Sequence, residues 1–310
     1  MADNKLKFNT RAIHVGNEPD RETGAVIAPI YASSTFQQEA VGVHKGYDYS
    51  RAGNPTQKRF EANIASLENG KHGILFSSGM AAITALFQTL KKDDHVIFGR
   101  NVYGGTYRLV VDVLTKHGFE FDFVDTRFLD KIEKKIKPNT RWVFLETPTN
   151  PLLELCDINK VSVLCKKHNI NLAVDNTFMS PYGQNPLNLG ADIIMHSATK
   201  YIGGHSDLIA GVLITNSDSI AEQLYFIQKS AGAVLSPFDS WLLLRSTKTL
   251  GIRVQKQSDN AIELAHRLSE HSKISSVIYP GLESHGQFKL ASIQQLNPKG
   301  DSIYGSMISL

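Results

Sequence analysis

The chain has 310 residues, of which 42% are hydrophobic, and its 33 basic and 30 acidic side chains leave a formal net charge of +3. This size is sufficient to bury a core and predicts one large domain or two smaller ones. The nearly balanced charge, without a run of lysine or arginine, argues against nucleic-acid binding, and no apolar stretch is long enough to span a bilayer.

Residues 1–49 are predicted to form an extended N-terminal arm. They are rich in Gly, Pro and Ser and show no sustained periodicity. The first residues, MADNKLKFNTR, lack the apolar run of a secretory signal. Further along, Cys156 and Cys165 have no CxxC spacing, so we expect them to be packing residues of a reduced, cytoplasmic protein.

Residues 50–245 are predicted to form an α/β domain. Short apolar runs bounded by Gly or polar turns alternate with amphipathic stretches, which is typical of a mostly parallel sheet flanked by helices. The expected strands are Ile74–Phe76, Val96–Phe98, Phe121–Val124, Trp142–Leu145, Leu172–Val174, Ile193–Met195 and Val212–Ile214. The expected helices are Met80–Lys92, Thr106–His117, Leu129–Ile136, Ile158–His168 and Ile220–Lys229.

Residues 246–310 are predicted to contain a linking helix and the start of a smaller C-terminal domain. Ser236 and Pro237 have the residue types of an N-cap and a first helical position, so a long, bent helix is expected from there. Two apolar runs, Val277–Tyr279 and Met307–Leu310, follow it. Because the chain stops inside the second run, we expect the smaller domain to be truncated.

Lys200 is the first candidate for chemistry, because it follows the apolar run Ile193–Met195 within the segment SATK. In open α/β sheets, ligands bind outside the carboxyl ends of the strands. A partly desolvated lysine there has a lowered pKa, and its amine can attack an aldehyde. Ser197 and Thr199 bring hydroxyls that can hold a phosphate. For an isolated SxxK, a surface lysine after a strand is the simpler alternative.

Asp175 also ends an apolar strand, where a lone acid is costly unless it pairs with a cation. The protonated ring nitrogen of pyridoxal 5'-phosphate (PLP) is such a partner, and a helix cap or a structural ion pair is the alternative. A strand, a turn and a helix start meet at Gly79 and Met80, where backbone N–H groups can bind a phosphate. This corner has neither the P-loop motif nor GxGxxG.

Two further segments complete a candidate cofactor site. Tyr103 is an aromatic residue at the end of a strand-to-helix loop and can stack on a flat ring, although anchoring the loop is the commoner role. Arg51 lies with Tyr49 where the arm meets the domain, and arginine suits bidentate contact with phosphate. A reactive lysine, a ring-nitrogen acid, a stacking aromatic residue and a phosphate-binding turn together predict a single PLP site.

The segments that carry these residues resemble the Cys/Met-metabolism PLP-dependent enzymes, the cystathionine γ-lyase and γ-synthase family of fold type I. The resemblance covers essentially the whole chain and is carried by YSRAGNPT, SSGMAA, VYGGTYR, ETPTNP, VDNTFMSP, HSATKYIGGHSD and LRSTKTL. It implies that Lys200 carries PLP as a Schiff base, that Asp175 pairs with the pyridine nitrogen and that Tyr103 stacks on the ring. No metal is expected.

The resemblance also implies roles for residues around the cofactor and the substrate. Tyr49 and Arg51 are expected to reach the phosphate of a neighbouring subunit in a homotetramer. Asp48 is expected to meet the second amino group of a substrate such as cystathionine, and Asn150 to lie near the ring hydroxyl and the substrate. The residues expected to bind the phosphate within the chain are Gly79, Met80, Ser197 and Thr199.

The chain departs from the family pattern at a few positions. Lys229 and Ser246 replace the usual Asn and Gly, Gly105 replaces the Cys of methionine γ-lyases, and the substrate-carboxylate arginine is expected beyond Leu310. The predicted reaction is γ-elimination of cystathionine to cysteine, 2-oxobutanoate and ammonia. Cystathionine γ-synthase, which joins an acylated homoserine to cysteine, and cystathionine β-lyase are the alternatives, with a non-catalytic PLP-binding protein as a more distant one.

Overall fold

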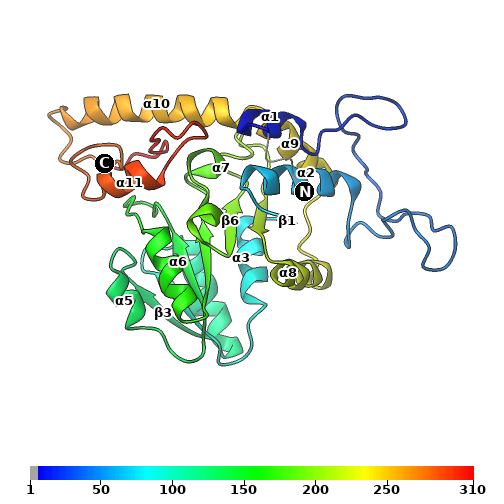
Figure 1. The fold of residues 1–310 in the computed structure, drawn as a ribbon, viewed down its shortest axis with the longest axis horizontal. Coiled ribbons are helices and arrows are strands. Elements are labelled where there is room, and N and C mark those ends of the chain that lie inside the picture. The colour runs from blue at the N-terminus through cyan, green and yellow to red at the C-terminus, as the bar shows by residue number, and fades with distance from the viewer. Residues whose placement is uncertain (1–5) are drawn as a thin grey trace. The chain divides into compact units, whose positions relative to one another are not determined.

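The computed structural model describes residues 6–310, which form two compact units (Figure 1). The first unit consists of the chain up to Thr89 together with His196–Leu250, and the second consists of Leu90–Met195 and Gly251–Leu310. Each unit therefore takes two separate stretches of the chain. The domain boundaries predicted at residues 49 and 245 differ from this division into units, which does not test them. Within residues 6–310, no helix has the length and apolar character needed to cross a membrane.

The second unit is built on a parallel sheet with the strand order β3-β2-β4-β5-β6. The first three residues of β6 lie in this unit, and its last two belong to the first unit. Strands β2, β4, β5 and β6 are largely buried on both faces, as burial between two layers of helices requires, whereas the edge strand β3 exposes Glu120. The sheet confirms the predicted mostly parallel α/β architecture. The bounds are β2 (His95–Gly99), β3 (Glu120–Val124), β4 (Thr140–Glu146), β5 (Asn171–Asp175) and β6 (Ile193–Ser197).

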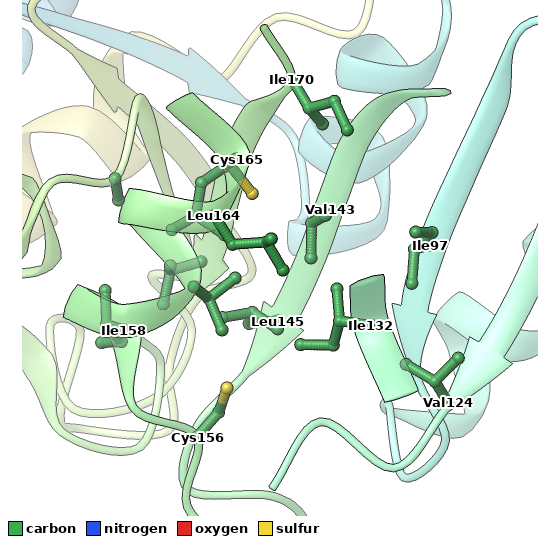
Figure 2. Close-up of a cluster of buried hydrophobic side chains, with 14 residues drawn as sticks. Ile97, Val124, Ile132, Val143, Leu145, Cys156, Ile158, Leu164, Cys165 and Ile170 are labelled. Carbon is green, nitrogen blue, oxygen red and sulfur yellow. The ribbon is translucent and has the colours of Figure 1, made fainter. Parts of the chain in front are cut away.

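One face of this sheet packs against helix α6 (Ile158–Lys167), as Figure 2 shows. Val143 and Leu145 of β4 meet Leu164 of the helix in a core without exposed apolar surface. The helix begins at Asp157, whose carboxylate accepts the N–H of Lys160 at 3.0 Å. Its neighbours in the second unit are α4 (Gly104–Arg108), η1 (Leu109–Val113), η2 (Leu114–His117), α5 (Leu129–Glu133), α7 (Ser180–Gly183), η3 (Pro186–Leu189), α10 (Leu250–Ser269, from its second residue) and α11 (Phe288–Gln294).

Both cysteines belong to this core. Cys156 and Cys165 are free thiols, each about 1% exposed. Burial raises the pKa of the Cys156 thiol far above its ordinary value and that of Cys165 to about 12. They are packing residues, in agreement with the expectation from their spacing.

The first unit contains one antiparallel pair of strands, β1 (His72–Phe76) and β7 (Gly211–Thr215). Helix α2 begins at Asn54, whose side chain accepts the N–H of Thr56, with Pro55 at the first helical position. Helix α8 ends at Gly232, which has a φ of 83° and caps the helix in the left-handed region. The helices of this unit are α1 (Phe8–His14), α2 (Pro55–Leu67), α3 (Gly79–Phe87), α8 (Asp218–Ala231) and α9 (Pro237–Thr247).

Several helical predictions were wrong in extent. Part of the expected extended arm forms α1, because Phe8 and Ala12, one turn apart, are both buried. The long helix expected to reach about Glu270 with a bend near Gly251 is instead interrupted at Lys248 and Thr249, between α9 and α10. The expected helix Thr106–His117 changes from α to π to 3₁₀ geometry along its length.

The two last apolar runs form no named strand among the described residues. They meet in an isolated antiparallel bridge, in which the N–H of Ile278 donates to the carbonyl of Ser309 at 2.8 Å and the reverse bond is 3.1 Å. The end of the chain is therefore paired with an earlier segment of the same unit.

Candidate active site

In the first unit, Lys200 lies in a tight turn directly after β6. The N–H of Lys200 donates to the carbonyl of Ser197 at 3.1 Å, and its own carbonyl accepts the N–H of Gly204 at 2.7 Å. The Thr199 hydroxyl accepts the N–H of Ala210 at 3.0 Å and lies 3.2 Å from the Ala210 carbonyl. The turn is thus fixed to the segment before β7, while the Lys200 side chain itself is exposed.

The predicted phosphate-binding turn lies at the start of α3 in the same unit. The Ser78 hydroxyl caps the helix by accepting the N–H of Ala81 at 3.0 Å. The N–H groups of Gly79 and Met80 belong to the first helical turn, which has no intrahelical acceptors for them. A Cβ added at Gly211 of β7 would overlap the Ser78 carbonyl, so glycine there allows the strand to pass close beneath the turn.

The arm residues Tyr49 and Arg51 lie beside the end of α8. The Arg51 guanidinium donates to the backbone carbonyl of Lys229, in the last turn of that helix, where the helix dipole favours a cation. Its Cζ atom is 5.2 Å from the centre of the Tyr49 ring. Because the contact uses the backbone, replacing the family's usual Asn by Lys229 leaves it available. Asp48 is exposed, and its carboxylate accepts the N–H of Tyr49 at 2.7 Å.

The second unit brings Tyr103, Asn150 and Asp175 together around a residue that sequence reasoning missed. Glu146, the last residue of β4, accepts the N–H of Tyr103 at 2.7 Å and that of Asn150 at 3.2 Å. Asp175, the last residue of β5, is its register partner across the two strands. Glu146 is the first residue of ETPTNP and ends an apolar strand, so the signal that indicated Asp175 was also present here.

The carboxyl groups at these two strand ends are close enough to oppose each other's ionisation. Burial, together with the charge of Asp175, raises the pKa of Glu146 to about 8. Asp175 is also largely buried, and its Oδ1 accepts the hydroxyl of Thr177 at 2.5 Å and the backbone N–H of the same residue at 3.0 Å. Two adjacent buried carboxylates favour a nearby cation, and a protonated pyridine nitrogen fits that requirement. The Tyr103 ring is 49% exposed and is available for stacking.

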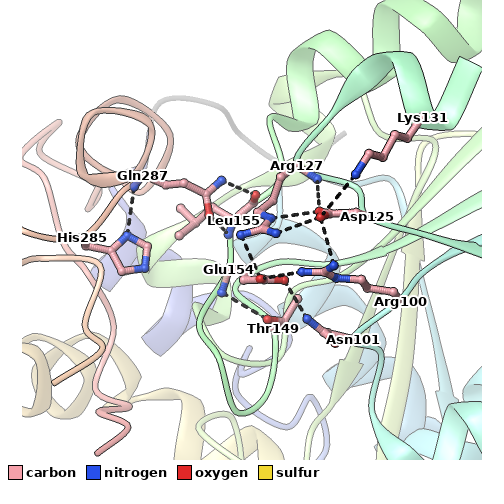
Figure 3. A network of polar contacts seen from close by, with 10 residues as sticks. All are labelled: Arg100, Asn101, Asp125, Arg127, Lys131, Thr149, Glu154, Leu155, His285 and Gln287. Carbon is pink, nitrogen blue, oxygen red and sulfur yellow. Dashed lines mark hydrogen bonds and ion pairs between the residues drawn. The ribbon is translucent and has the colours of Figure 1, made fainter. Parts of the chain in front are cut away.

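A polar network joins the segments that contain Asn101 and Thr149, as Figure 3 shows, and these segments lead to Tyr103 and Asn150 in the sequence. Glu154, in the segment after β4, accepts the side chain of Asn101 at 2.6 Å and that of Arg100, at the end of β2, at 3.0 Å. Arg127 bonds to Asp125 at 2.8 and 2.9 Å, and this hydrogen bonding is the main cause of the lowered pKa of Asp125. The charges alternate in sign, so both segments are held by mutually compensating groups.

A second clamp comes from α11 and the residue before it. The Gln287 side chain accepts the N–H of Leu155 at 2.7 Å and donates to the carbonyl of the same residue at 2.5 Å. Gln294 likewise accepts the N–H of Ile158 and donates to the carbonyl of Cys156, both at 3.0 Å. Each glutamine side-chain amide thus pairs with the backbone by two hydrogen bonds, as a neighbouring strand would, and fixes the segment between Glu154 and α6.

The family model described as Cys/Met metabolism PLP-dependent enzyme matches residues 9–309. A protein named "Probable cystathionine gamma-synthase" from Herpetosiphon aurantiacus is 50% identical over 303 residues, 98% of this chain and 93% of that relative. A "Cystathionine beta-lyase" from Lactococcus lactis subsp. cremoris (strain MG1363) is 47% identical over 302 residues, 97% of this chain and 78% of the relative. The crystal structure of cystathionine gamma-lyase from Lactobacillus plantarum complexed with L-serine has a TM-score of 0.94 at 44% identity, covering 98% of this chain and 78% of its own.

Proposed function

Since this chain belongs to the Cys/Met metabolism PLP-dependent enzymes, we propose that it cleaves cystathionine by γ-elimination to cysteine, 2-oxobutanoate and ammonia. It is an enzyme of fold type I, and its cofactor is pyridoxal 5'-phosphate. Its relatives are named for γ-lyase, γ-synthase and β-lyase activities, so membership of the family leaves the individual reaction open.

The cofactor supplies an electron sink for the bond that breaks at the substrate Cα. Lys200 would hold the cofactor covalently, and its Nζ, when free, would take the proton from the substrate Cα. Asp175 would keep a proton on the pyridine nitrogen, and Tyr103 would cover one face of the ring.

Phosphate recognition would combine backbone and side-chain donors of the first unit. The N–H groups of Gly79 and Met80 face the open end of α3, and the hydroxyls of Ser197 and Thr199 lie on the turn that leads to Lys200. In a homotetramer, Tyr49 and Arg51 would serve the phosphate of the neighbouring subunit. We expect the enzyme to act in the cytoplasm, where its two free thiols stay reduced.

The observation that carries cystathionine as the substrate is the exposed carboxylate of Asp48, oriented by the N–H of Tyr49 at 2.7 Å. Cystathionine has a second ammonium group that this carboxylate can attract, whereas methionine has none. Asn150 would lie near the substrate as well. The second candidate is γ-synthase, which is favoured by the relative of that name at 50% identity.

Product analysis of the purified, yellow protein separates the reactions. With cystathionine alone, γ-elimination releases 2-oxobutanoate and cysteine, whereas β-elimination releases pyruvate and homocysteine. With an acylated homoserine and cysteine, a γ-synthase forms cystathionine. Pyruvate from cystathionine, or efficient synthesis with little cleavage, would contradict the γ-lyase assignment.

Borohydride reduction tests the cofactor attachment independently of the substrate. Reduction followed by peptide mapping should place the pyridoxyl group on Lys200. The Lys200→Ala variant is the control and should carry no reduced pyridoxyl group. A pyridoxyl group on any other lysine of the wild-type chain would show that the attachment site has been misassigned.

A further inference from the structure

Glu146 makes a pair of backbone contacts that the proposed function does not account for. Its Oε2 atom accepts the N–H of Tyr103, which precedes α4, at 2.7 Å. Its Oε1 atom accepts the N–H of Asn150, in the loop after β4, at 3.2 Å. One carboxylate therefore joins two loops whose residues lie 43 and 4 positions from it in sequence.

We propose that Glu146 is a positioning residue for the reaction, whose carboxylate fixes the backbone of the ring-stacking Tyr103 and of the substrate-facing Asn150 at one point. This inference rests on the proposed function for the roles of Tyr103 and Asn150. Glu146 would thereby fix the position of the Tyr103 ring relative to Asn150.

Both the type and the length of the side chain matter for this task. Two backbone N–H donors need two acceptors in one plane, and both oxygens of a carboxyl group can accept in either protonation state, whereas an amide offers one acceptor and one competing donor. Aspartate is shorter by one C–C bond of about 1.5 Å. A bond of 2.7 Å lengthened by that amount exceeds hydrogen-bonding distance.

The surroundings of Glu146 indicate a functional cause for a carboxylate there. Asp175 is its register partner, and burial and this neighbour raise its pKa. A purely structural link between two loops does not require an acid in such an unfavourable place, and perturbed carboxylates gather at functional sites.

The inference is tested with Glu146→Gln and Glu146→Asp, and with Glu61→Gln as the matched control. Glu61 is a buried carboxylate of the first unit whose pKa is also raised, chiefly by burial, and it lies outside the proposed site. The first measurement is amide hydrogen exchange of cofactor-free protein in peptides containing Tyr103 and Asn150. We expect exchange about fivefold faster in both Glu146 variants, the factor for one lost hydrogen bond of about 1 kcal/mol, and no change in the control.

The second measurement is the visible circular dichroism of the bound cofactor, with kcat and KM for cystathionine. We expect an altered dichroic band, a higher KM and a lower kcat in both Glu146 variants. Glu146→Asp keeps the carboxyl group and loses the reach, so full recovery in this variant would show that an acid without the two hydrogen bonds is sufficient and would overturn the inference.

The possible results separate the two proposals. Unchanged exchange in both loops overturns the positioning role, whatever the substrate is. Faster exchange with unchanged dichroism and kinetics shows that Glu146 joins the loops but does not serve the reaction, which also overturns it. If the Glu146 variants show faster exchange and an altered cofactor band, the positioning role is supported. If the wild-type enzyme at the same time does not cleave cystathionine, the proposed substrate is contradicted.

Discussion

The Glu146→Gln substitution should destabilise the protein at acidic pH and stabilise it at alkaline pH. Burial and the charge of Asp175 raise the pKa of Glu146 from 4.5 to about 8 in the folded protein. Between these values the folded state keeps a proton that the unfolded chain has lost. The associated stabilisation is complete below pH 4.5 and is lost as the pH rises through about 8.

The magnitude follows from the width of this window. Each pH unit between the two pKa values lowers the free energy of unfolding by about 1.4 kcal/mol, or roughly 5 kcal/mol in total. Glutamine does not titrate, so the variant avoids this loss. It forfeits one of the two backbone hydrogen bonds, which is worth about 1 kcal/mol. The variant should therefore be less stable than the wild type at pH 4.5 and more stable at pH 8.5.

The assay is urea unfolding of cofactor-free protein, followed by far-UV circular dichroism at several pH values between 4.5 and 8.5. The quantity of interest is the difference in free energy of unfolding between variant and wild type. Glu222→Gln, at an exposed site of α8, is the control and should follow the wild-type curve. Parallel curves for Glu146→Gln and wild type across the whole range would refute the reasoning, since they would mean that Glu146 titrates normally.

Three further predictions concern the cofactor and the substrate. Gly211→Ala should weaken PLP binding in a spectrophotometric titration, because its Cβ would overlap the Ser78 carbonyl; unchanged affinity would contradict this. Mixing Arg51→Ala with Lys200→Ala should restore part of the activity if Arg51 serves the neighbouring subunit, and no recovery despite proven subunit exchange would argue against sharing. Asp48→Asn should raise KM for cystathionine several-fold, which corresponds to a loss of up to about 1 kcal/mol of binding free energy, and should leave KM for acylated homoserine unchanged. Equal effects on both substrates would show that Asp48 does not recognise the second ammonium group.

The strands were predictable from the sequence because their signal is local. Each of the seven predicted runs, such as Val96–Phe98 and Val212–Ile214, lies within a strand, and in the interior strands burial on both faces requires a continuous apolar run. Helix boundaries were less accurate. The stretch Thr106–His117 has helical periodicity, but it changes to π and 3₁₀ geometry, which periodicity does not record.

The role of Glu146 was not predicted from the sequence because it depends on the pairing between strands. Asp175 could be identified alone, as an acid at the end of an apolar strand. The importance of Glu146 depends on β4 lying beside β5 in a register that makes these two acids neighbours. It also depends on two loops that approach the same carboxylate. Both are long-range relations, and no local pattern of residues specifies them.

The burial of both natural thiols makes the chain convenient for site-specific labelling. Thiol reagents attack the thiolate, and Cys156 and Cys165 are inaccessible and have raised pKa values, so neither should react in the folded protein. A cysteine in place of the exposed Lys229 would then be the single reactive thiol, and both native cysteines could stay. Because Arg51 bonds to the backbone carbonyl at that position, a fluorophore attached there would report on the arm while leaving its anchor in place.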